Sequence, residues 1–280
     1  MKAAVPFLKW AGGKRALVPE ILARLPDSID TYYEPFLGGG AVFFALAARG
    51  AFKRAVICDR NRDLIDAYLG VRDDVEGVIA RLARLRHDAR TYARVRSQDP
   101  AKLTLTRRAA RIIYLNRTCY NGLYRVNRKG QFNVPFGRYK NPRILDRENL
   151  RAVSRTLQKA RIAESKDFEA LVEKAEPGDA VYFDPPYAPV SPTSSFTAYD
   201  SLPFGEDEQE RLAKVMRQLQ RRRVYALLSN SDVPLTRRLY KRYACDSVQV
   251  HRRINSRPDR RGPISELLVR THARIPRPRG

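Results

Sequence analysis

Apolar and polar positions change their period along the chain, and the pattern predicts an α/β fold. The first sixty residues predict a helix, a strand, a glycine turn, a second helix and a second strand, at 14–25, 31–35, 38–40, 41–48 and 54–58. The second strand ends at Asp59. A strand, a glycine-rich turn, a helix and a strand that ends in an acid are typical of the nucleotide-binding half of a doubly wound sheet.

The middle of the chain has a different pattern. Residues 63–113 place apolar side chains at helical spacing among many arginines, which predicts a helical insert with a basic exterior. Aromatic and basic residues then interleave over 119–139. Within that stretch, 124–126 and 131–134 flank the turn 127–130, and we expect a β-hairpin there.

The α/β pattern returns from about residue 143. It predicts helices at 149–157, 169–174 and 206–221 and strands at 180–183, 224–228 and 265–269. The Pro- and Arg-rich end, 275–280, is expected to fray. We therefore expect an α/β core at 1–60 and 144–280, with a helical domain that carries the hairpin inserted at 61–143.

The charge balance favours a polyanionic partner. The 280 residues include 54 Lys and Arg against 30 Asp and Glu, a net charge of +24. Such an excess suits nucleic acid, although runs such as 221–223 could also be solvated helix faces. A membrane surface fits less well, because no strongly amphipathic basic helix stands out.

Other features point to a cytosolic protein without a metal. No apolar run approaches the roughly 18 residues of a membrane span, and the N-terminus lacks the apolar stretch of a signal peptide. Three scattered cysteines argue against a disulfide framework and a cysteine-rich zinc site. The three histidines have no metal-ligand spacing. We expect a monomer in the cytoplasm of a bacterium or of a phage host.

The most informative segment is Asp184-Pro185-Pro186-Tyr187, which follows an apolar strand. One reaction that such a segment would suit is methylation of the exocyclic amine of adenine. This amine is a poor nucleophile, because its lone pair is delocalised into the ring. A carboxylate from Asp184 and the carbonyl of Pro185, held by two prolines of fixed φ, could accept its two N–H bonds. Tyr187 offers a flat face for stacking the base. The alternative is a proline turn that merely ends the strand.

Three further features near the N-terminus suggest a ligand pocket. The turn 38–40 allows positive φ and close approach of a ligand to the backbone, although such turns are common. Asp59 has the position of an acid that accepts ribose hydroxyls, or of a helix cap before Asn61. Trp10 and Lys14 could line the pocket, with Lys14 pairing with a carboxylate, or Trp10 could be a core residue.

Taken together, these motifs resemble the Dam-type, D12-class adenine-N6 DNA methyltransferases along nearly the whole chain. The segments that carry the resemblance, in the order that the α group of the family has, are 6–14, 34–40, 59–61, 184–187 and 196–199. The resemblance implies a Rossmann-like core that uses S-adenosylmethionine to methylate adenine in double-stranded DNA. It gives the cofactor contacts as Trp10, Lys14, Phe36, Gly38, Gly40, Asp59, Asp167, Phe168 and Asp184. From its own context Phe168 is equally a core residue.

The same resemblance implies a DNA-reading region at 119–125 and 133–139. Tyr120 and Asn121 would lie near the vacated base, while Leu123 and Pro135 would contact a thymine methyl group. Arg125 would pair bidentately with guanine, which makes GATC the expected target. The resemblance also gives Lys9 and Tyr139 as DNA contacts. The arginine-rich part of the insert and the C-terminal tail match no motif of the family.

Other functions remain open at this point. A DNA-binding regulator with a vestigial pocket is one, but the intact set Lys14, Asp59, Asp184 and Tyr187 argues against it. A methyltransferase acting on RNA or protein is another, and the hairpin around Arg125 favours DNA. Methylation of cytosine N4 would use the same amine chemistry, and the motif order favours adenine.

Overall fold

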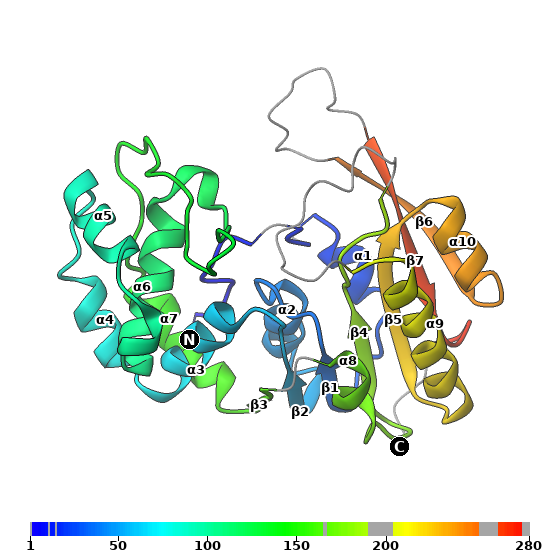
Figure 1. The fold of residues 1–280 in the computed structure, drawn as a ribbon. Helices are drawn as coiled ribbons and strands as arrows, with labels where there is room; N and C mark the ends of the chain where they lie inside the picture. Colours follow the sequence, from blue (N-terminus) through cyan, green and yellow to red (C-terminus); the bar gives the residue numbers. More distant parts are fainter. Residues whose placement is uncertain are drawn as a thin grey trace. The chain divides into compact units, whose positions relative to one another are not determined.

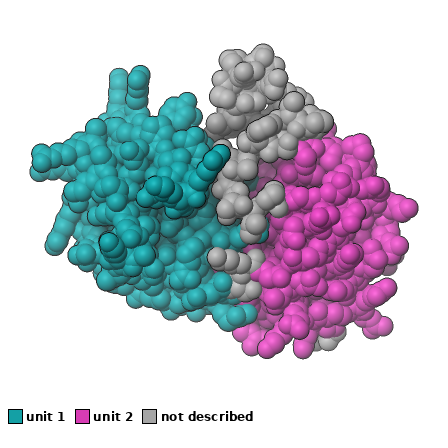
Figure 2. All heavy atoms as spheres, in the orientation of Figure 1, with its two compact units in different colours: residues 1–13, 37–48, 58–166 teal, residues 14–36, 49–57, 167–280 magenta. Residues whose placement is uncertain are grey.

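The computed structural model describes residues 2–10, 12–14, 16–164, 167–189, 204–251 and 263–275. The chain divides into two compact units, shown in different colours in Figure 2. Unit 1 comprises 1–13, 37–48 and 58–166, and unit 2 comprises 14–36, 49–57 and 167–280. The family-like segment 196–199 and the tail 276–280 lie outside the described residues.

Unit 2 contains a mixed β-sheet. Its strands are β1 (Ile29–Glu34), β2 (Phe52–Ile57), β4 (Ala180–Phe183), β5 (Tyr225–Ser231), β6 (Ala244–His251) and β7 (Pro263–Arg270). They lie in the order β2-β1-β4-β5-β7-β6, and β7 is antiparallel to both of its neighbours while β2, β1, β4 and β5 are parallel. This is a Rossmann-like α/β sheet, as the sequence predicts.

The central strands of this sheet are apolar because both of their faces are covered. Every residue of β4 and of β5 is buried. Parallel strands covered on both faces read as continuous apolar runs, which is why 180–183 and 224–228 can be recognised in the sequence. The last residues of β5, 229–231, are polar and yet buried, so they need hydrogen-bond partners.

The helices of unit 2 are α1 (Val18–Leu22), α8 (Phe168–Val172), α9 (Glu206–Arg221) and α10 (Pro234–Tyr240) (Figure 1). The long helix α9 packs on β5. Its buried residues Leu212, Val215, Met216 and Leu219 recur every three or four positions and so form one apolar stripe. Three acidic residues in its first turn stabilise the helix, because negative charge interacts favourably with the positive N-terminal end of the helix dipole.

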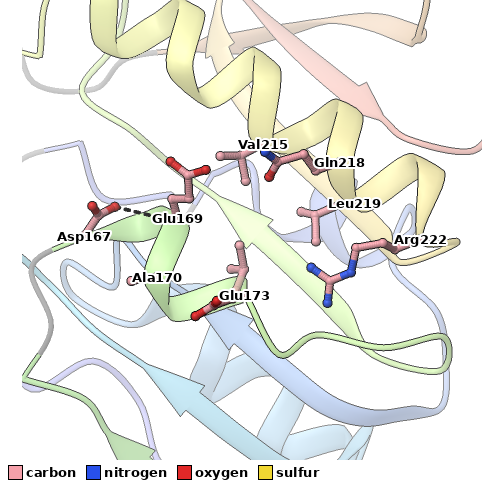
Figure 3. Close-up of a pocket in the computed structure, with 9 residues that line it drawn as sticks. Asp167, Glu169, Ala170, Glu173, Val215, Gln218, Leu219 and Arg222 are labelled. Carbon is pink, nitrogen blue, oxygen red and sulfur yellow. Dashed lines mark hydrogen bonds between the residues drawn. The ribbon is translucent and has the colours of Figure 1, made fainter.

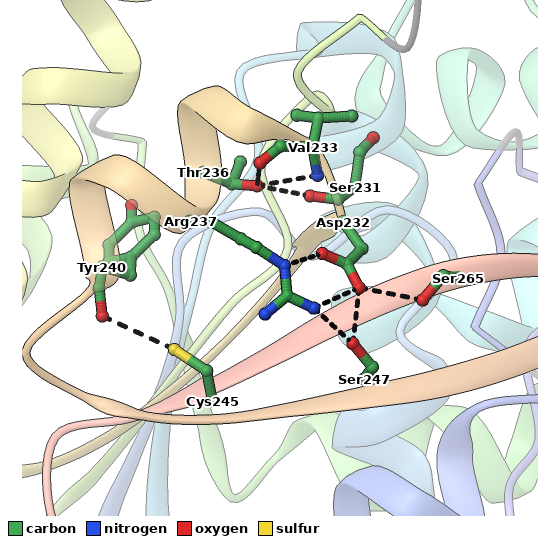
Figure 4. A network of polar contacts seen from close by, with 9 residues as sticks. All are labelled: Ser231, Asp232, Val233, Thr236, Arg237, Tyr240, Cys245, Ser247 and Ser265. Carbon is green, nitrogen blue, oxygen red and sulfur yellow. Dashed lines mark hydrogen bonds and ion pairs between the residues drawn. The ribbon is translucent and has the colours of Figure 1, made fainter.

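A polar network joins the end of β5 to the next elements (Figure 4). The Asp232 carboxylate accepts from Arg237 Nε at 2.6 Å and Arg237 Nη2 at 2.8 Å. It also accepts from Ser247 Oγ on β6 and from Ser265 Oγ on β7, the latter at 3.0 Å. One carboxylate therefore fixes α10 against the β6–β7 pair.

Unit 1 is mainly helical. It contains most of α2 (Ala41–Arg49), then α3 (Arg62–Asp73), α4 (Val75–Leu82), α5 (Ala89–Arg96), α6 (Leu105–Thr118), α7 (Arg147–Leu157) and the short strand β3 (Ala160–Ile162), with 3₁₀ turns at Pro100–Lys102 and Tyr120–Gly122. Helix α6 is buried along most of its length and contacts α3, α4 and α5. The expected helical insert is therefore helical, and it lies wholly within unit 1.

The expected hairpin is less regular than the sequence suggests. The described backbone has isolated antiparallel bridges at Val126–Phe132 and Cys119–Phe136 in place of two continuous strands. The turn itself forms as expected: Asn127 N donates to Gln131 O at 2.9 Å, and Gly130 has a φ of +73°. Pro135 has no N–H to donate to a strand ladder, which is one physical reason for the interruption.

Several other element boundaries differ from the sequence-based expectations. The first helix spans Val18–Leu22 where the apolar spacing predicts 14–25. Three elements have no counterpart among the expectations, namely β3, α10 and β6. In the described part of the chain no helix is long and apolar enough to span a membrane.

Candidate active site

Two neighbouring parallel strands of unit 2 lead into residues with an expected role. Asp184 directly follows β4, and Phe36 lies two residues beyond the end of β1. The strands pair in parallel with Tyr33 opposite Val181, so their carboxyl ends lie at the same edge of the sheet. That edge is where doubly wound folds place their ligands.

The two oxygens of the Asp184 carboxylate have different surroundings. Lys14 Nζ lies 2.7 Å from Oδ1, and Ser229 Oγ donates to the same oxygen at 3.1 Å. Ser229 also hydrogen-bonds to the Tyr182 hydroxyl at 2.9 Å. Among the described residues none donates to Oδ2. The carboxylate is thus held by one oxygen and presents the other.

The turn that follows Asp184 is fixed by β5 and α9. Asn230 Oδ1 accepts from the backbone N–H of Ala188 at 3.0 Å, and Asn230 Nδ2 donates to Gln209 Oε1 at 2.9 Å. Gln209 Nε2 in turn donates to the carbonyl of Pro186 at 2.9 Å. No described residue donates to the carbonyl of Pro185, so this carbonyl can still accept a hydrogen bond.

Tyr187 is held at both its ring face and its hydroxyl. Lys14 Nζ lies 4.6 Å from the ring centroid, which is cation–π distance. The hydroxyl donates to Glu266 Oε2 at 2.6 Å. Lys14 therefore contacts both Asp184 and Tyr187, and it is itself buried with 9% of its side chain exposed.

Burial dominates the electrostatics of this cluster. It raises the pKa of Asp184 above its usual value, although the contacts with Lys14 and Ser229 act in the opposite direction. It also raises the pKa of Tyr187 far above its usual value, and the nearby carboxylates of Asp184 and Glu266 add to that rise. Tyr187 is therefore neutral at physiological pH, and its O–H can act as a donor.

Phe168 belongs to an aromatic cluster in unit 2. Its ring centroid lies 5.6 Å from that of Phe36 and 6.0 Å from that of Phe204. The guanidinium of Arg211 stacks on it at 4.2 Å. Arg211 also pairs with Asp167, which at the same time caps α8 by accepting from the N–H of Glu169 at 2.9 Å.

A pocket of about 440 Å³ lies beside this cluster, between α8 and α9 (Figure 3). Asp167, Glu169 and Glu173 line it from α8 and the residues around it, and Gln218 of α9 and Arg222 just after that helix line the other side. None of the residues of the Asp184 turn lines it. Asp167 is the one candidate cofactor residue on its wall, so the pocket is separate from the predicted amine site.

In unit 1 the expected glycine turn is present and braced. Gly38 has a φ of +50°, and its N–H donates to Asp59 Oδ2 at 2.8 Å while Asp59 Oδ1 accepts from Asn61 N at 2.9 Å. A Cβ at Gly38 would lie 3.1 Å from Trp10 Cδ1. Trp10 is half-buried against the turn and is not a core residue.

The neighbouring contacts explain one glycine and decide one alternative. The Cβ of a side chain at Gly40, where φ is +71°, would lie 2.8 Å from the Tyr68 hydroxyl, so glycine is needed there. The side chain that caps α3 belongs to Asn61, which accepts from Leu64 N at 3.0 Å. Asp59 therefore braces the turn and does not cap the helix.

The expected DNA-contacting residues of unit 1 are brought together around the loop 119–139. Lys9 Nζ lies 4.7 Å from the centroid of the Tyr139 ring, and Lys9 is joined to Asn116 through its backbone N–H at 2.8 Å. Tyr120 N donates to Pro135 O at 2.9 Å, and its side chain is 51% exposed. Asn121 and Pro135 are also exposed, and Leu123 is half-buried.

Arg125 is exposed but already oriented. Its Nε donates to Asn133 Oδ1 at 2.7 Å and its Nη2 donates to the Asn133 carbonyl at 3.2 Å. No described residue is bonded to Nη1. The Nη1–Nη2 end of the guanidinium is therefore left for a bidentate partner.

Sequence reasoning missed the residues that position this site. Ser229, Asn230, Gln209 and Glu266 all act on the Asp184 turn, yet none was a candidate. The three polar residues at the end of the otherwise apolar strand β5 were a usable signal. Gln209 and Glu266 had no such signal, because an isolated polar residue in a helix or strand most often faces solvent.

Comparison with known proteins identifies the family. A family model described as D12 class N6 adenine-specific DNA methyltransferase matches residues 10–254. The chain belongs to this family. The description of the family decides among the alternatives above. The chain is an adenine-specific DNA methyltransferase. A regulator with a vestigial pocket and a cytosine-N4 enzyme are not supported.

Individual relatives agree with this assignment over almost the full length. Type II methyltransferase M1.LlaDCHI of Lactococcus lactis subsp. cremoris is 43% identical over 271 residues, which are 94% of either chain. Type II methyltransferase M.MjaIII of Methanocaldococcus jannaschii is 43% identical over 283 residues, 94% of this chain and 98% of that one. DNA adenine methylase of Escherichia coli K12 is 38% identical over 278 residues, 96% of each.

Proposed function

We propose that this family member transfers a methyl group from S-adenosylmethionine to N6 of an adenine extruded from double-stranded DNA, within GATC. The observation that carries the proposal is the asymmetry of the Asp184 turn. Lys14 and Ser229 hold one carboxylate oxygen, while Oδ2 and the carbonyl of Pro185 remain as acceptors. Two adjacent acceptors are what an exocyclic amine with two N–H bonds requires.

Each unit, taken by itself, has features that suit the cofactor. In unit 1, Gly38 and Gly40 have positive φ and leave the backbone of the turn open to a ligand, with Trp10 beside it and Asp59 bracing it. In unit 2, the rings of Phe36 and Phe168 and the ammonium of Lys14 suit a purine and a carboxylate. S-adenosylmethionine, when bound, supplies an electrophilic methyl group on a sulfonium centre.

The protein's own part is to prepare the amine. With its two hydrogens held by Asp184 Oδ2 and the Pro185 carbonyl, the nitrogen is drawn towards a pyramidal geometry in which its lone pair leaves the ring plane. The fixed φ of both prolines and the bond from Gln209 to the Pro186 carbonyl keep this turn from rearranging. Much of the acceleration comes from this positioning.

Tyr187 supports the extruded base. An adenine in a duplex is inaccessible, and its extrusion costs a few kcal/mol. Stacking on an aromatic ring contributes about 1–3 kcal/mol per base and offsets that cost. Tyr187 follows the Asp184 turn directly, is held at its hydroxyl and has Lys14 over one face of its ring, so in this proposal the base stacks on the opposite face.

Residues 61–143 serve as the DNA-recognition domain in this proposal. Tyr139, together with Lys9 from outside this segment, contacts the DNA backbone near the target adenine. Tyr120 and Asn121, both exposed, enter the space that the extruded base leaves. Leu123 and Pro135 contact thymine methyl groups. The oriented guanidinium of Arg125 reads guanine, and its bond to Asn133 supports this role.

Labelled methyl transfer onto unmethylated DNA tests the proposal. The wild-type protein is expected to produce N6-methyladenine and to protect GATC from a nuclease that methylation blocks. Asp184→Ala removes the anchored acceptor and should lower transfer at least about 10³-fold, with DNA binding within about threefold, because the lost contacts act on the amine. Asp27→Asn, an exposed carboxylate away from the turn, is the control. Near-wild-type turnover of Asp184→Ala, or GATC that stays sensitive, would overturn the respective part.

A further inference from the structure

Glu266 is a buried carboxylate that no step of the proposed chemistry uses. It lies on β7 opposite Ser231 of β5, and only 6% of the residue is exposed. The Tyr187 hydroxyl donates to its Oε2 at 2.6 Å. That distance is in the range of hydroxyl-to-carboxylate bonds, which are about twice as strong as bonds between neutral groups.

The surroundings of Glu266 make a purely structural role a poor explanation. The next three residues of β7 are Leu267, Leu268 and Val269, each fully buried. Burying a carboxylate costs several kcal/mol, and apolar replacements of buried polar pairs are often neutral or stabilising. A carboxylate at this position therefore calls for a role in what its partner does.

Its partner, Tyr187, is restrained at three points. The backbone after it is held by the bond from Ala188 N to Asn230 Oδ1. Lys14 Nζ lies over the ring at 4.6 Å from the centroid. A tyrosine side chain with a fixed backbone still rotates about two bonds. Its hydroxyl oxygen lies on the axis of the second rotation, so fixing that oxygen sets the direction in which the side chain points, while the contact of Lys14 with the ring face restrains the turning of the ring about that axis.

We propose that Glu266 is a positioning residue, which accepts a hydrogen bond from the Tyr187 hydroxyl and so fixes the position of the ring on which the target base stacks. This inference rests on the proposed function, since the stacking role of Tyr187 belongs to it. In this proposal Glu266 contacts neither the base nor the cofactor. It acts through Tyr187, and its effect should vanish when Tyr187 has no hydroxyl to donate.

A double-mutant cycle on full-length protein tests this dependence. Glu266→Ala should lower the single-turnover rate of methyl transfer on the order of 10–100-fold, because small misplacements of a reacting group have effects of this size. The KM for duplex DNA should change less than about threefold, since the substitution leaves the proposed DNA-contacting residues of 119–139 in place. Tyr187→Phe, which keeps the ring and loses the hydroxyl, should have a similar effect.

The double variant decides between a positioning role and a purely structural role of Glu266. If Glu266 acts through the hydroxyl, Glu266→Ala adds little in the Tyr187→Phe background. Glu266→Gln should restore the rate to within about fivefold of wild type, because its amide oxygen can accept the same hydrogen bond. Full additivity of the two substitutions, or no rescue by glutamine, would overturn the positioning role.

Controls separate this result from loss of folding and from failure of the proposed function. Glu20→Ala, which removes a half-exposed carboxylate of unit 2, should leave the rate unchanged. If Glu266→Ala does not fold, Glu266→Leu fills a similar volume without an acceptor and completes the cycle. If wild-type protein methylates no adenine, the proposed function fails. If wild type is active and the substitutions are additive, only the role of Glu266 is wrong.

Discussion

At the scale of the residue, the central feature is a carboxylate whose two oxygens differ in their hydrogen-bond partners. Oδ1 of Asp184 is bonded to Lys14 and Ser229, and Oδ2 is left to accept. The same principle applies to Arg125, where Asn133 occupies one side of the guanidinium and leaves its end exposed. In both, a polar group is oriented before its ligand arrives, which lowers the cost of ordering it on binding.

Ser229 gives a prediction for the pH dependence of methyl transfer. Burial raises the pKa of Asp184, and the hydrogen bond from Ser229 lowers it. The proposed chemistry needs the ionised carboxylate, so activity falls as the pH falls through that pKa. Ser229→Ala removes the lowering contact and should move the acid limb of the kcat/KM profile to higher pH.

The matched control for that profile is Tyr182→Phe. It removes the other hydrogen bond of Ser229, from the Tyr182 hydroxyl at 2.9 Å, and leaves the contact with Asp184 in place. Its acid limb should stay near that of wild type. An acid limb in Ser229→Ala that coincides with the wild-type limb would show that the ionisation of Asp184 does not control activity.

At the scale of the element, β5 and its continuation organise unit 2. Its buried residues 229–231 support the Asp184 turn, and the next residue, Asp232, ties α10 to β6 and β7. The contacts with Arg237 are the main cause that lowers the pKa of Asp232 to about 2. A carboxylate with a depressed pKa in the folded state stabilises that state when it is ionised.

Asp232→Asn should therefore destabilise the protein at neutral pH. The shift from 3.8 to about 2 corresponds to about 2 kcal/mol, reduced to about 1–2 kcal/mol because Arg237 is more than half exposed. This contribution is complete above the unfolded-state pKa of about 3.9 and is lost as the pH falls towards 2. Urea unfolding of both proteins at pH 7 and pH 3 measures it, with Asp27→Asn as the control. A difference that does not shrink at pH 3 would contradict the assignment.

At the scale of the whole molecule, the net charge of +24 is the dominant property. A charge of this size attracts a polyanion over long range and produces binding that does not depend on sequence. Sequence choice must then come from the few residues that reach base edges. Affinity and specificity in this methyltransferase are therefore expected to have different origins.

DNA binding should accordingly weaken steeply with salt. For six to ten phosphate contacts, affinity is expected to fall about 10³–10⁵-fold between 50 and 200 mM salt. Fluorescence anisotropy with a labelled duplex measures the slope of log K against log salt. The single-turnover rate at saturating DNA is the internal control and should change little. A slope near zero would contradict an electrostatic origin of the affinity.

The sequence by itself determined the fold class and the family, and it predicted the residues of the Asp184 turn as the reacting ones. Strands such as 180–183 are legible because burial on both faces requires an unbroken apolar run. The Asp184 turn and the glycine turn are legible because few residue types combine the required acid, fixed φ and positive φ.

Only the tertiary structure decided which groups hold those residues in place. Ser229, Gln209 and Glu266 are separated from Asp184 by 45, 25 and 82 positions, and no local pattern connects them. The short strand β3 and the irregular hairpin at 119–139 were also beyond the sequence, because their geometry depends on packing more than on local propensity. Hydrogen bonds over such separations exist only once the sheet has aligned its strand ends.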